Sequence, residues 1–306
     1  MDFLTPNQPT PLQELTDEIV RRAGVKLFIK RDDLIHPAVS GNKWRKLKYT
    51  IFTARQNGYS TLLTFGGGFS NHLFAVAAAG RAAGIGTIGI VRGEELTPDS
   101  SPTLQFCREQ GMKLCFVSRR EYRLKEESVR VREIVEEAKA PYLVPEGGSN
   151  PLALPGVREM VREVEQQLTY KPDYYAVAAG TGGTSAGILS APAPVLAFSA
   201  LKGGDFLREE ISKLAGTEFQ SAYLQLFTDY HFGGYARYTH DLLSFIREFE
   251  QRHHIPLEQV YTGKMLFGLY DLMEKGFFKP GSTLVAVHTG GLQGRLASLP
   301  PFHQEI

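Results

Sequence analysis

The chain has 306 residues, of which 42% are hydrophobic and 11% aromatic, and this is enough apolar material for two domains. Its 34 basic and 33 acidic residues give a net charge of +1, so no overall electrostatic field attracts nucleic acid. Cys107 and Cys115 are too few for a disulfide framework or a thiolate metal site. We therefore expect a small ligand bound in a cleft, and no metal.

The N-terminal residues 1–15 have neither the charged start nor the apolar run of a signal peptide. The most apolar window, residues 73–91, is interrupted by Arg81 and by glycines. This window predicts a helix followed by a strand and no membrane span. We expect a cytoplasmic protein without membrane or nucleic-acid partners.

Apolar runs rich in β-forming residues alternate along the chain with longer segments of helical periodicity. Strands are predicted at 26–30, 61–66, 87–91 and 113–117, and helices at 42–58, 70–84 and 101–111. The charged stretch 119–139 is typical of one solvated amphipathic helix. This alternation predicts an α/β fold with two open parallel sheets, each covered by helices on both faces, and ligands at the carboxyl ends of strands.

The pattern restarts after a segment rich in Pro and Gly at 146–155, which is a plausible domain boundary. The later half contains a helical segment at 156–168 and apolar strands at 174–179, 195–199 and 283–287. Only about ten residues separate Thr184 from the strand at Val195. The helix between them must be short, and if it tilts the preceding glycine-rich loop, ligand affinity would suffer.

Three predicted strands end in glycine-rich loops. The loop Gly180, Thr181, Gly182, Gly183, Thr184 offers N–H groups and hydroxyls that suit a phosphate, or it is a tight turn without a ligand. Its spacing is a poor match to a dinucleotide fingerprint. The second loop, Gly66 to Gly68, leads to Ser70 and Asn71 at the start of a helix. Ser70 is either the N-cap of this helix or, with Asn71, a group that binds a carboxylate. The third loop contains Thr289, Gly290 and Gly291.

Lys43 differs from the other lysines of "SGNKWRKLKYT", because it follows Gly41 and Asn42 at the start of a predicted helix, whereas Lys46 and Lys48 lie farther along. A helix N-terminus and nearby cations both lower the pKa of an ammonium group, as a Schiff-base lysine requires. A phosphate loop together with an amine nucleophile indicates pyridoxal phosphate (PLP). The alternative is a basic surface patch.

The segments "KRDDL", "SGNKWRKLKY", "GGGFSNH", "AAGTGGTSAG", "VYTGKMLFGL" and "HTGG" together resemble the D-cysteine desulfhydrase and 1-aminocyclopropane-1-carboxylate (ACC) deaminase family of PLP enzymes. The resemblance runs in order through nearly the whole chain. It implies the fold type II, tryptophan synthase β-like architecture and a homodimer. It also implies a large PLP-binding domain formed by residues 1–46 and 147–306, with a small inserted domain at 47–146.

The resemblance also implies roles for individual residues. Lys43 matches the lysine that binds the cofactor aldehyde, Asn71 the asparagine at its phenolic oxygen, and Ser70 the serine that meets the substrate. Matches to the phosphate cradle are Thr181, Gly182, Gly183 and Thr184, and matches to two active-site tyrosines are Tyr235 and Tyr261. Each tyrosine is otherwise explained as a core aromatic. His72 either helps to hold the substrate carboxylate with Ser70 and Asn71, or is structural.

Thr262 and Thr289 occupy the cofactor-binding positions where ACC deaminases of the family have Glu and Leu. A carboxylate keeps the pyridine nitrogen protonated and strengthens the electron sink, and we do not expect a threonine hydroxyl to do so. The resemblance therefore favours an α,β-elimination that converts D-cysteine to pyruvate, ammonia and sulfide. ACC deaminase, a catalytically silent PLP-binding protein and a nucleotide-dependent Rossmann-like enzyme are the alternatives.

The segment after "SNH" reads Leu73, Phe74, Ala75, which is more apolar than in many relatives. We expect these residues to form an apolar pocket wall. An apolar wall weakens the assignment of D-cysteine as the substrate.

Overall fold

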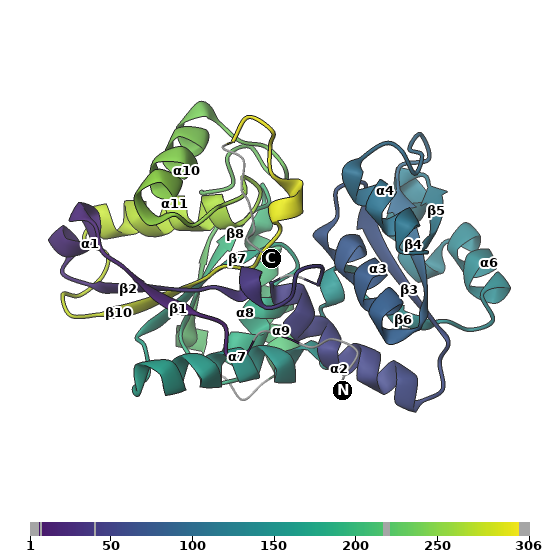
Figure 1. Cartoon of the computed structure of the whole chain (residues 1–306), viewed down its shortest axis with the longest axis horizontal. Coiled ribbons are helices and arrows are strands. Elements are labelled where there is room, and N and C mark those ends of the chain that lie inside the picture. The colour runs from purple at the N-terminus through teal and green to yellow at the C-terminus, as the bar shows by residue number, and fades with distance from the viewer. Residues whose placement is uncertain (1–5, 7, 40, 217–220, 300–306) are drawn as a thin grey trace.

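The computed structural model describes residues 6, 8–39, 41–216 and 221–299. The described chain forms two lobes, each built around its own sheet (Figure 1). We call them the large lobe, around a six-stranded sheet, and the small lobe, around a four-stranded sheet. No helix among the described residues is long and apolar enough to cross a membrane.

The large sheet combines strands from both ends of the chain. In spatial order its strands are β1 (Leu12–Leu15), β2 (Lys26–Lys30), β10 (Thr283–Val287), β7 (Tyr174–Ala179), β8 (Val195–Ser199) and β9 (Leu224–Phe227). All pairs are parallel except β1 with β2, and β10 pairs with β2 and β7. The C-terminal strand therefore lies in the middle of the sheet, beside the N-terminal strands (Figure 1).

Helices cover both faces of the large sheet because its strands are apolar on both sides. One buried cluster contains residues of α1 (Glu18–Ala23), α10 (His240–His253) and α11 (Thr262–Glu274). The cluster on the opposite face contains residues of α7 (Ala153–Leu168), α8 (Gly183–Leu189) and α9 (Leu207–Ala215). The short α8 agrees with the few residues available between the strands β7 and β8.

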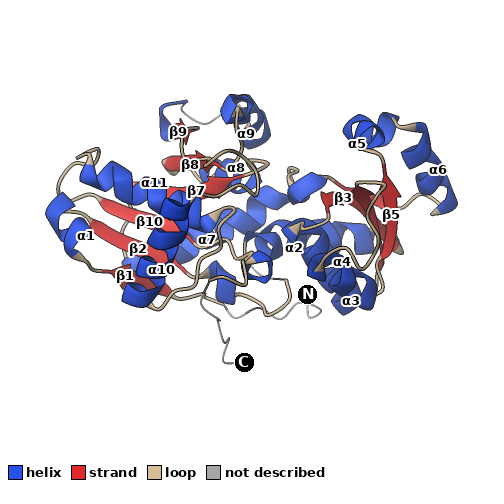
Figure 2. Cartoon of the chain, turned by 90° about the horizontal axis from the view of Figure 1, so that it is seen from above, coloured by secondary structure: helices blue, strands red, loops and turns tan. Residues whose placement is uncertain are grey.

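The small sheet is parallel throughout, with the order β5 (Lys113–Val117), β4 (Gly86–Arg92), β3 (Thr61–Gly67) and β6 (Tyr142–Val144). Figure 2 shows α3 (Asn71–Ala83) and α4 (Pro102–Glu109) on one side, with α5 (Arg119–Leu124) and α6 (Val129–Glu137) on the other. Short 3-10 helices are η1 (Asp32–Leu34), η2 (Lys125–Glu127), η3 (Glu146–Gly148), η4 (Gly204–Phe206), η5 (Ser221–Tyr223) and η6 (Leu292–Gly294).

Helix α2 (Asn42–Gln56) belongs to both lobes. Its residues Trp44 and Leu47 are buried in the core of the small lobe. Its backbone crosses α7 of the large lobe so closely that a Cβ on Gly156 would lie 2.0 Å from the Arg45 carbonyl oxygen. The buried Arg45 guanidinium also pairs with Asp32 at 2.8 Å and with Glu163 at 2.6 Å. These contacts fix the helix that begins next to Lys43.

The predicted fold class is confirmed: both sheets are dominated by parallel strands and packed between helices. The prediction of one helix over 119–139 is wrong, because α5 ends at Leu124 and α6 begins at Val129. Between them Lys125 has a φ of 50° and pairs with Glu146, and Ser128 caps α6. The antiparallel edge strand β1 and the strand β9 were not predicted.

Candidate functional site

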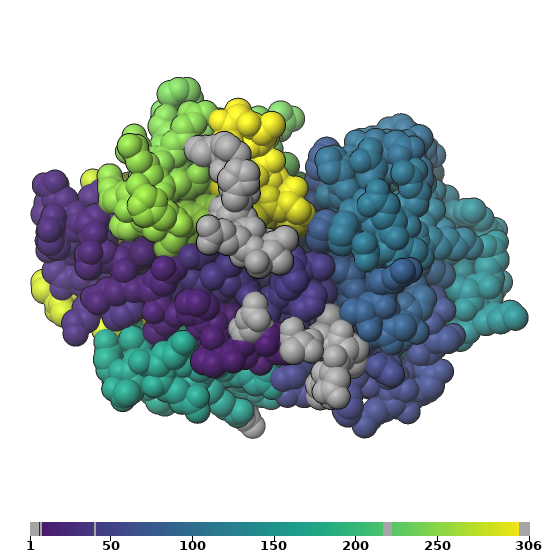
Figure 3. Space-filling model, in the orientation of Figure 1, coloured from purple at the N-terminus to yellow at the C-terminus, as the bar shows by residue number. Residues whose placement is uncertain are grey.

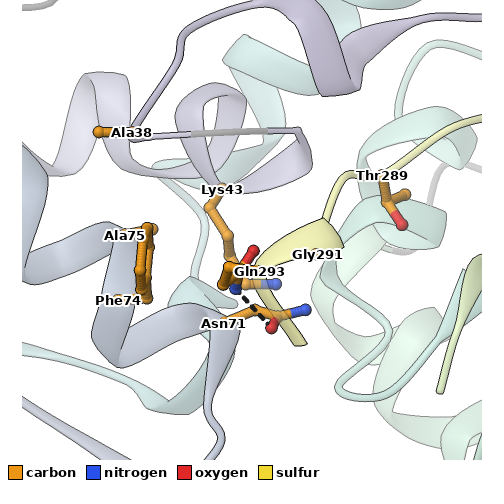
Figure 4. Close-up of a pocket in the computed structure, with 8 residues that line it drawn as sticks. All are labelled: Ala38, Lys43, Asn71, Phe74, Ala75, Thr289, Gly291 and Gln293. Atoms are coloured by element: carbon orange, nitrogen blue, oxygen red, sulfur yellow. Dashed lines mark hydrogen bonds between the residues drawn. The ribbon is translucent and has the colours of Figure 1, made fainter. Parts of the chain in front are cut away.

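A pocket between the lobes brings together residues from three segments of the chain. It is lined by Ala38, Lys43, Asn71, Phe74, Ala75, Thr289, Gly291 and Gln293, and Figure 4 shows Lys43, Asn71 and Gln293 converging. The empty space among these residues is about 230 Å³, open solvent included. The predicted residues Lys43, Asn71 and Thr289 are thus neighbours, although 246 positions separate the first from the last.

Backbone contacts hold the start of α2 against the end of β10. Gly41 has a φ of +65°, and a Cβ there would lie 1.9 Å from the carbonyl oxygen of Thr289, so only glycine fits. The Asn42 N–H donates to the same carbonyl oxygen at 3.3 Å. Thr289 therefore positions the neighbour of Lys43 through its backbone.

The Lys43 side chain is half-buried, and its Nζ donates to Asn42 Oδ1 at 3.2 Å. Burial lowers the pKa of Lys43 from 10.5 to about 8. The predicted direction of this shift agrees with the structure, but its main cause is desolvation and not the helix N-terminus. A neutral amine is therefore populated near physiological pH, and this is the form that attacks a carbonyl carbon.

The loop from Thr181 to Thr184 lies next to this amine. Asn42 joins the two, since its Nδ2 donates to Thr184 Oγ1 at 2.9 Å. Thr181 Oγ1 lies 2.6 Å from Ser149 Oγ. A Cβ on Gly183 would lie 2.4 Å from Ser149 Oγ, so a larger residue at 183 would fill the space between these hydroxyls. We call the hydroxyls of Ser149, Thr181 and Thr184 the hydroxyl cradle.

Lys46 completes the cradle and was missed by the sequence interpretation, which set it aside as lying farther along the helix. Its Nζ donates to Ser149 Oγ at 2.9 Å and would lie 2.8 Å from a Cβ on Gly183. The side chain is 1% exposed, and no carboxylate among the described residues pairs with it. Burial and the charge of Lys43 lower its pKa well below 10.5. The spacing of three residues from Lys43 was the available signal, because it places both lysines on one helix face.

The N-terminus of α3 carries the predicted residues Ser70, Asn71 and His72. Ser70 is the N-cap of α3 and its Oγ accepts from the Leu73 N–H at 3.2 Å, as the capping alternative predicts. His72 is buried, and its Nε2 lies 2.8 Å from Thr64 Oγ1, which donates to the Val144 carbonyl oxygen. Burial lowers the pKa of His72 well below 6.5. This neutral, internally bonded ring favours the structural alternative for His72.

Glu258, which the sequence analysis also missed, organises the start of α11. This 1% exposed carboxylate accepts hydrogen bonds from the N–H groups of Val260, Tyr261 and Thr262. The Thr262 hydroxyl donates to Glu258 Oε1 at 3.0 Å and accepts from the Glu258 N–H at 3.1 Å. With its proton committed to Glu258, the hydroxyl of Thr262 is left as an acceptor toward any further partner.

The two predicted tyrosines, Tyr235 and Tyr261, lie against each other beside the glycine-rich loop that follows β7. Their ring centroids are 6.1 Å apart in an edge-to-face arrangement, and the hydroxyl groups share a hydrogen bond. Tyr261 packs over Gly180, where a Cβ would lie 3.1 Å from the ring. The buried Lys264 donates to the carbonyl oxygens of His231 and Gly234, both at 2.8 Å, and so anchors the loop that carries Tyr235.

The apolar wall differs in part from the expectation. Phe74 and Ala75 line the pocket, and Phe74 stacks on Phe106 with centroids 3.7 Å apart. Leu73 does not line it: the side chain is fully buried and packs against Gly66 and Gly89. The expectation for Leu73 is wrong because, on a helix, adjacent residues point about 100° apart.

Comparison with known proteins agrees with this arrangement. The profile of the family described as Pyridoxal-phosphate dependent enzyme matches residues 4–290. The chain belongs to this family. This enzyme is 33% identical to the bifunctional D-cysteine desulfhydrase/1-aminocyclopropane-1-carboxylate deaminase, mitochondrial, of Arabidopsis thaliana, over 89% of the chain and 73% of that relative. It is 29% identical to the D-cysteine desulfhydrase of Klebsiella pneumoniae, over 95% of the chain and 94% of the relative.

A solved structure of an ACC deaminase homologue superposes on this enzyme with a TM-score of 0.79 and 30% identity, covering 93% of this chain and 90% of the other. The resemblance found in the sequence, the fold type II architecture and the cofactor are therefore confirmed. The residues fit the cofactor as well, because the pocket offers the Lys43 amine for an aldehyde, and Lys46, beside the hydroxyl cradle, offers a phosphate a buried amine without a carboxylate partner among the described residues.

Proposed function

We propose that this enzyme is a PLP-dependent lyase that catalyses α,β-elimination and deamination of a small amino acid, with D-cysteine as the preferred substrate. The observation that carries the proposal is the pair Lys43 and Lys46 on one face of α2. Lys46 is a buried amine that lacks a carboxylate partner among the described residues and touches the hydroxyl cradle, and Lys43 lies one turn before it. A bound phosphate would favour the charged form of Lys46. An amine and an anion site at this spacing suit a phosphorylated aldehyde.

In this proposal Lys43 would hold the cofactor covalently, and Asn71 would donate to its phenolic oxygen. Its phosphate would be held by Lys46, Ser149 and the predicted loop Thr181, Gly182, Gly183 and Thr184. Thr262 would bind the pyridine nitrogen, with Thr289 as a further cofactor-binding residue. When bound, the cofactor supplies an electron sink for the Cα of the substrate.

The remaining residues bind the substrate and move protons. The base that takes the α-proton is the freed Lys43 amine or another group, and Ser70 with the adjacent N–H groups holds the carboxylate. Phe74 and Ala75 exclude water from one wall of the pocket. Tyr235 and Tyr261 are proton-transfer groups toward the β-substituent, since burial raises the pKa of both hydroxyls and keeps them protonated. The net reaction converts D-cysteine and water to pyruvate, ammonia and hydrogen sulfide.

A specific observation favours ACC deaminase as the second candidate. The Thr262 hydroxyl donates its hydrogen bond to Glu258. The Thr262 oxygen can therefore accept a hydrogen bond from a protonated pyridine nitrogen. The carboxylate expected of an ACC deaminase is thus present as Glu258, which would act on the pyridine nitrogen through the Thr262 hydroxyl. This reduces the contrast between Thr262 and a glutamate that was drawn from the sequence.

We also propose the domain division expected from the sequence: residues 1–46 and 147–306 as the PLP-binding domain and 47–146 as the inserted domain. The division follows the two sheets, and its first boundary falls inside α2. A homodimer in the cytoplasm is part of the same proposal.

The test is product release by the purified enzyme reconstituted with PLP. Sulfide and pyruvate are measured with D-cysteine, and ammonia and α-ketobutyrate with ACC. Equal amounts of sulfide and pyruvate from D-cysteine, absent with L-cysteine and lost in Lys43→Ala, support the proposal. Turnover of ACC alone supports the second candidate. Visible absorbance of the bound cofactor that depends on Lys43, without any product, indicates a catalytically silent PLP-binding protein.

A further inference from the structure

A second hollow, larger than the first, lies at the carboxyl ends of the strands of the small sheet and holds about 1230 Å³ of empty space. Its charged residues are Arg92, Glu95, Arg119, Arg123, Lys125 and Glu146. We call this hollow the basic cleft. All the residues that line the basic cleft belong to the small lobe, which is the blue and teal part of Figure 3.

The charges of the basic cleft do not cancel. Arg119 pairs with Glu95 at 2.7 Å, and Lys125 pairs with Glu146 at 2.6 Å. Arg92 and Arg123 have no carboxylate within ion-pair distance among the described residues of the chain. Two positive charges therefore remain uncompensated in a concave surface, where low-dielectric walls concentrate the field.

Of Arg92 and Arg123, Arg92 is the better placed to bind a carboxylate. It is the last residue of β4, and its guanidinium lies 5.7 Å from the ring centroid of Tyr122. A Cβ on Gly67 would lie 3.6 Å from Arg92 Nη2. Gly67 begins the turn to Ser70, whose N–H donates to the Gly67 carbonyl oxygen at 3.0 Å. The residue is exposed, and its planar guanidinium is suited to bidentate binding of a carboxylate.

The basic cleft adjoins the proposed active site on two sides. Glu146 precedes Gly147, where a Cβ would lie 2.5 Å from Thr181 Oγ1 of the hydroxyl cradle. Desolvation raises the pKa of Tyr235, and the nearby charges of Arg92 and Glu146 act on it in opposite directions. Gly67 lines the cleft and accepts the Ser70 N–H, so an amino acid held at Ser70 would lie at the edge of the cleft.

We infer that the basic cleft binds a carboxylate at the far end of the β-substituent of the substrate, with Arg92 as its main ligand. The inference rests on the proposed function, because it assigns substrates to that site: small amino acids whose leaving group carries a second negative charge. In the elimination the α-proton goes to the base, the Cβ–S bond breaks with both electrons on sulfur, and the thiolate takes up a proton. Water converts the three-carbon remainder to pyruvate and ammonia.

The experiment compares two thioethers that differ in one charge. S-carboxymethyl-D-cysteine ends in a carboxylate and releases thioglycolate, and S-carbamoylmethyl-D-cysteine has a neutral amide of nearly the same shape. Pyruvate release gives kcat/KM for the PLP-loaded enzyme, and calorimetry gives the affinity. We expect the carboxylate to be preferred by about tenfold, as for a charge-assisted hydrogen bond, and the preference to fall with added salt.

The variant Arg92→Gln is expected to abolish this preference, and Arg92→Lys to restore part of it. The control Arg130→Gln removes the same charge from an exposed pair with Glu133 outside the cleft, and is expected to leave the preference unchanged. Equal loss for both thioethers in Arg92→Gln would overturn the inference and place Arg92 at the α-carboxylate. No charge preference in the starting enzyme would also overturn it.

These outcomes separate the inference from the proposed function. If both thioethers release pyruvate equally well, the lyase assignment stands and the inference about the cleft fails. If no compound releases pyruvate but calorimetry shows a preference that depends on Arg92, the lyase assignment fails and the cleft remains an anion site.

Discussion

Gln293 Nε2 donates a 2.7 Å hydrogen bond to Asn71 Oδ1, and this bond joins η6 of the large lobe to the first residue of α3 in the small lobe. The bond occupies the carbonyl oxygen of Asn71, so the amide N–H groups are left as donors. A donor is what the phenolic oxygen of the cofactor requires. Gln293 thereby sets the orientation of the proposed cofactor ligand.

Gln293→Glu is expected to weaken PLP binding more than Gln293→Ala. The carboxylate can only accept, so it turns the Asn71 amide and presents its carbonyl oxygen to the cofactor oxygen. We expect a loss of about tenfold or more for Glu and a smaller loss for Ala, measured by absorbance titration of the apoenzyme. Equal affinities in both variants would show that Gln293 does not orient Asn71.

Lys46→Met is expected to weaken binding of PLP by about a hundredfold, because a buried charge contact to phosphate is lost. Binding of pyridoxal, which lacks the phosphate, should hardly change. Lys48→Met is the matched control, since Lys48 pairs with Glu159 at 2.7 Å outside the cradle. A similar loss for PLP and pyridoxal would argue against a phosphate contact at Lys46.

Covalent capture of PLP by the apoenzyme is expected to speed up with pH, with a midpoint at about pH 8, and to level off about one pH unit above the midpoint. Burial lowers the pKa of Lys43 to about 8, so its amine is charged below this pH and neutral above it. Stopped-flow absorbance at saturating cofactor, from about pH 6.5 to about pH 10, measures the midpoint. A midpoint near the ordinary lysine pKa of 10.5 would contradict the burial of this amine.

Gly156→Ala is expected to lower the free energy of unfolding by about 1–3 kcal/mol, because the new methyl group overlaps the Arg45 carbonyl oxygen and forces α2 away from α7. Since α2 also positions Lys43, weaker PLP binding should accompany the loss. Gln166→Ala, at an exposed position of α7, is the control and should leave both quantities nearly unchanged. Urea unfolding measures the first quantity and absorbance titration the second.

Strands and helices of the sequence were predictable where periodicity and glycine mark them, as for the strand ending at Gly67 and the helix beginning at Asn71. Lys43 was also predictable, because glycine and asparagine before a basic helix mark an unusual position. Contacts between segments that lie far apart in the sequence were not predictable. Lys46 is assigned to a phosphate site only because Ser149 and Gly183 lie beside it, and these residues are more than a hundred positions away.

Local chemistry misled the prediction in two places. Thr262 was judged as an isolated hydroxyl, yet it donates a hydrogen bond to Glu258, four residues earlier. The charged stretch 119–139 has helical periodicity on both sides of Lys125, but the ion pair of Lys125 with Glu146 and the cap at Ser128 interrupt it. Both effects depend on turns that hydrophobic periodicity does not record.

The central place of β10 in the large sheet has a consequence for biosynthesis. The ribosome delivers β1 and β2 first, and they must wait for β10, the last described strand, before the sheet can join β2 to β7. The small lobe, whose four strands are contiguous in sequence, can fold while this happens. Asn42 can make its contact with Thr289 only after β10 and the residues that follow it have been synthesised.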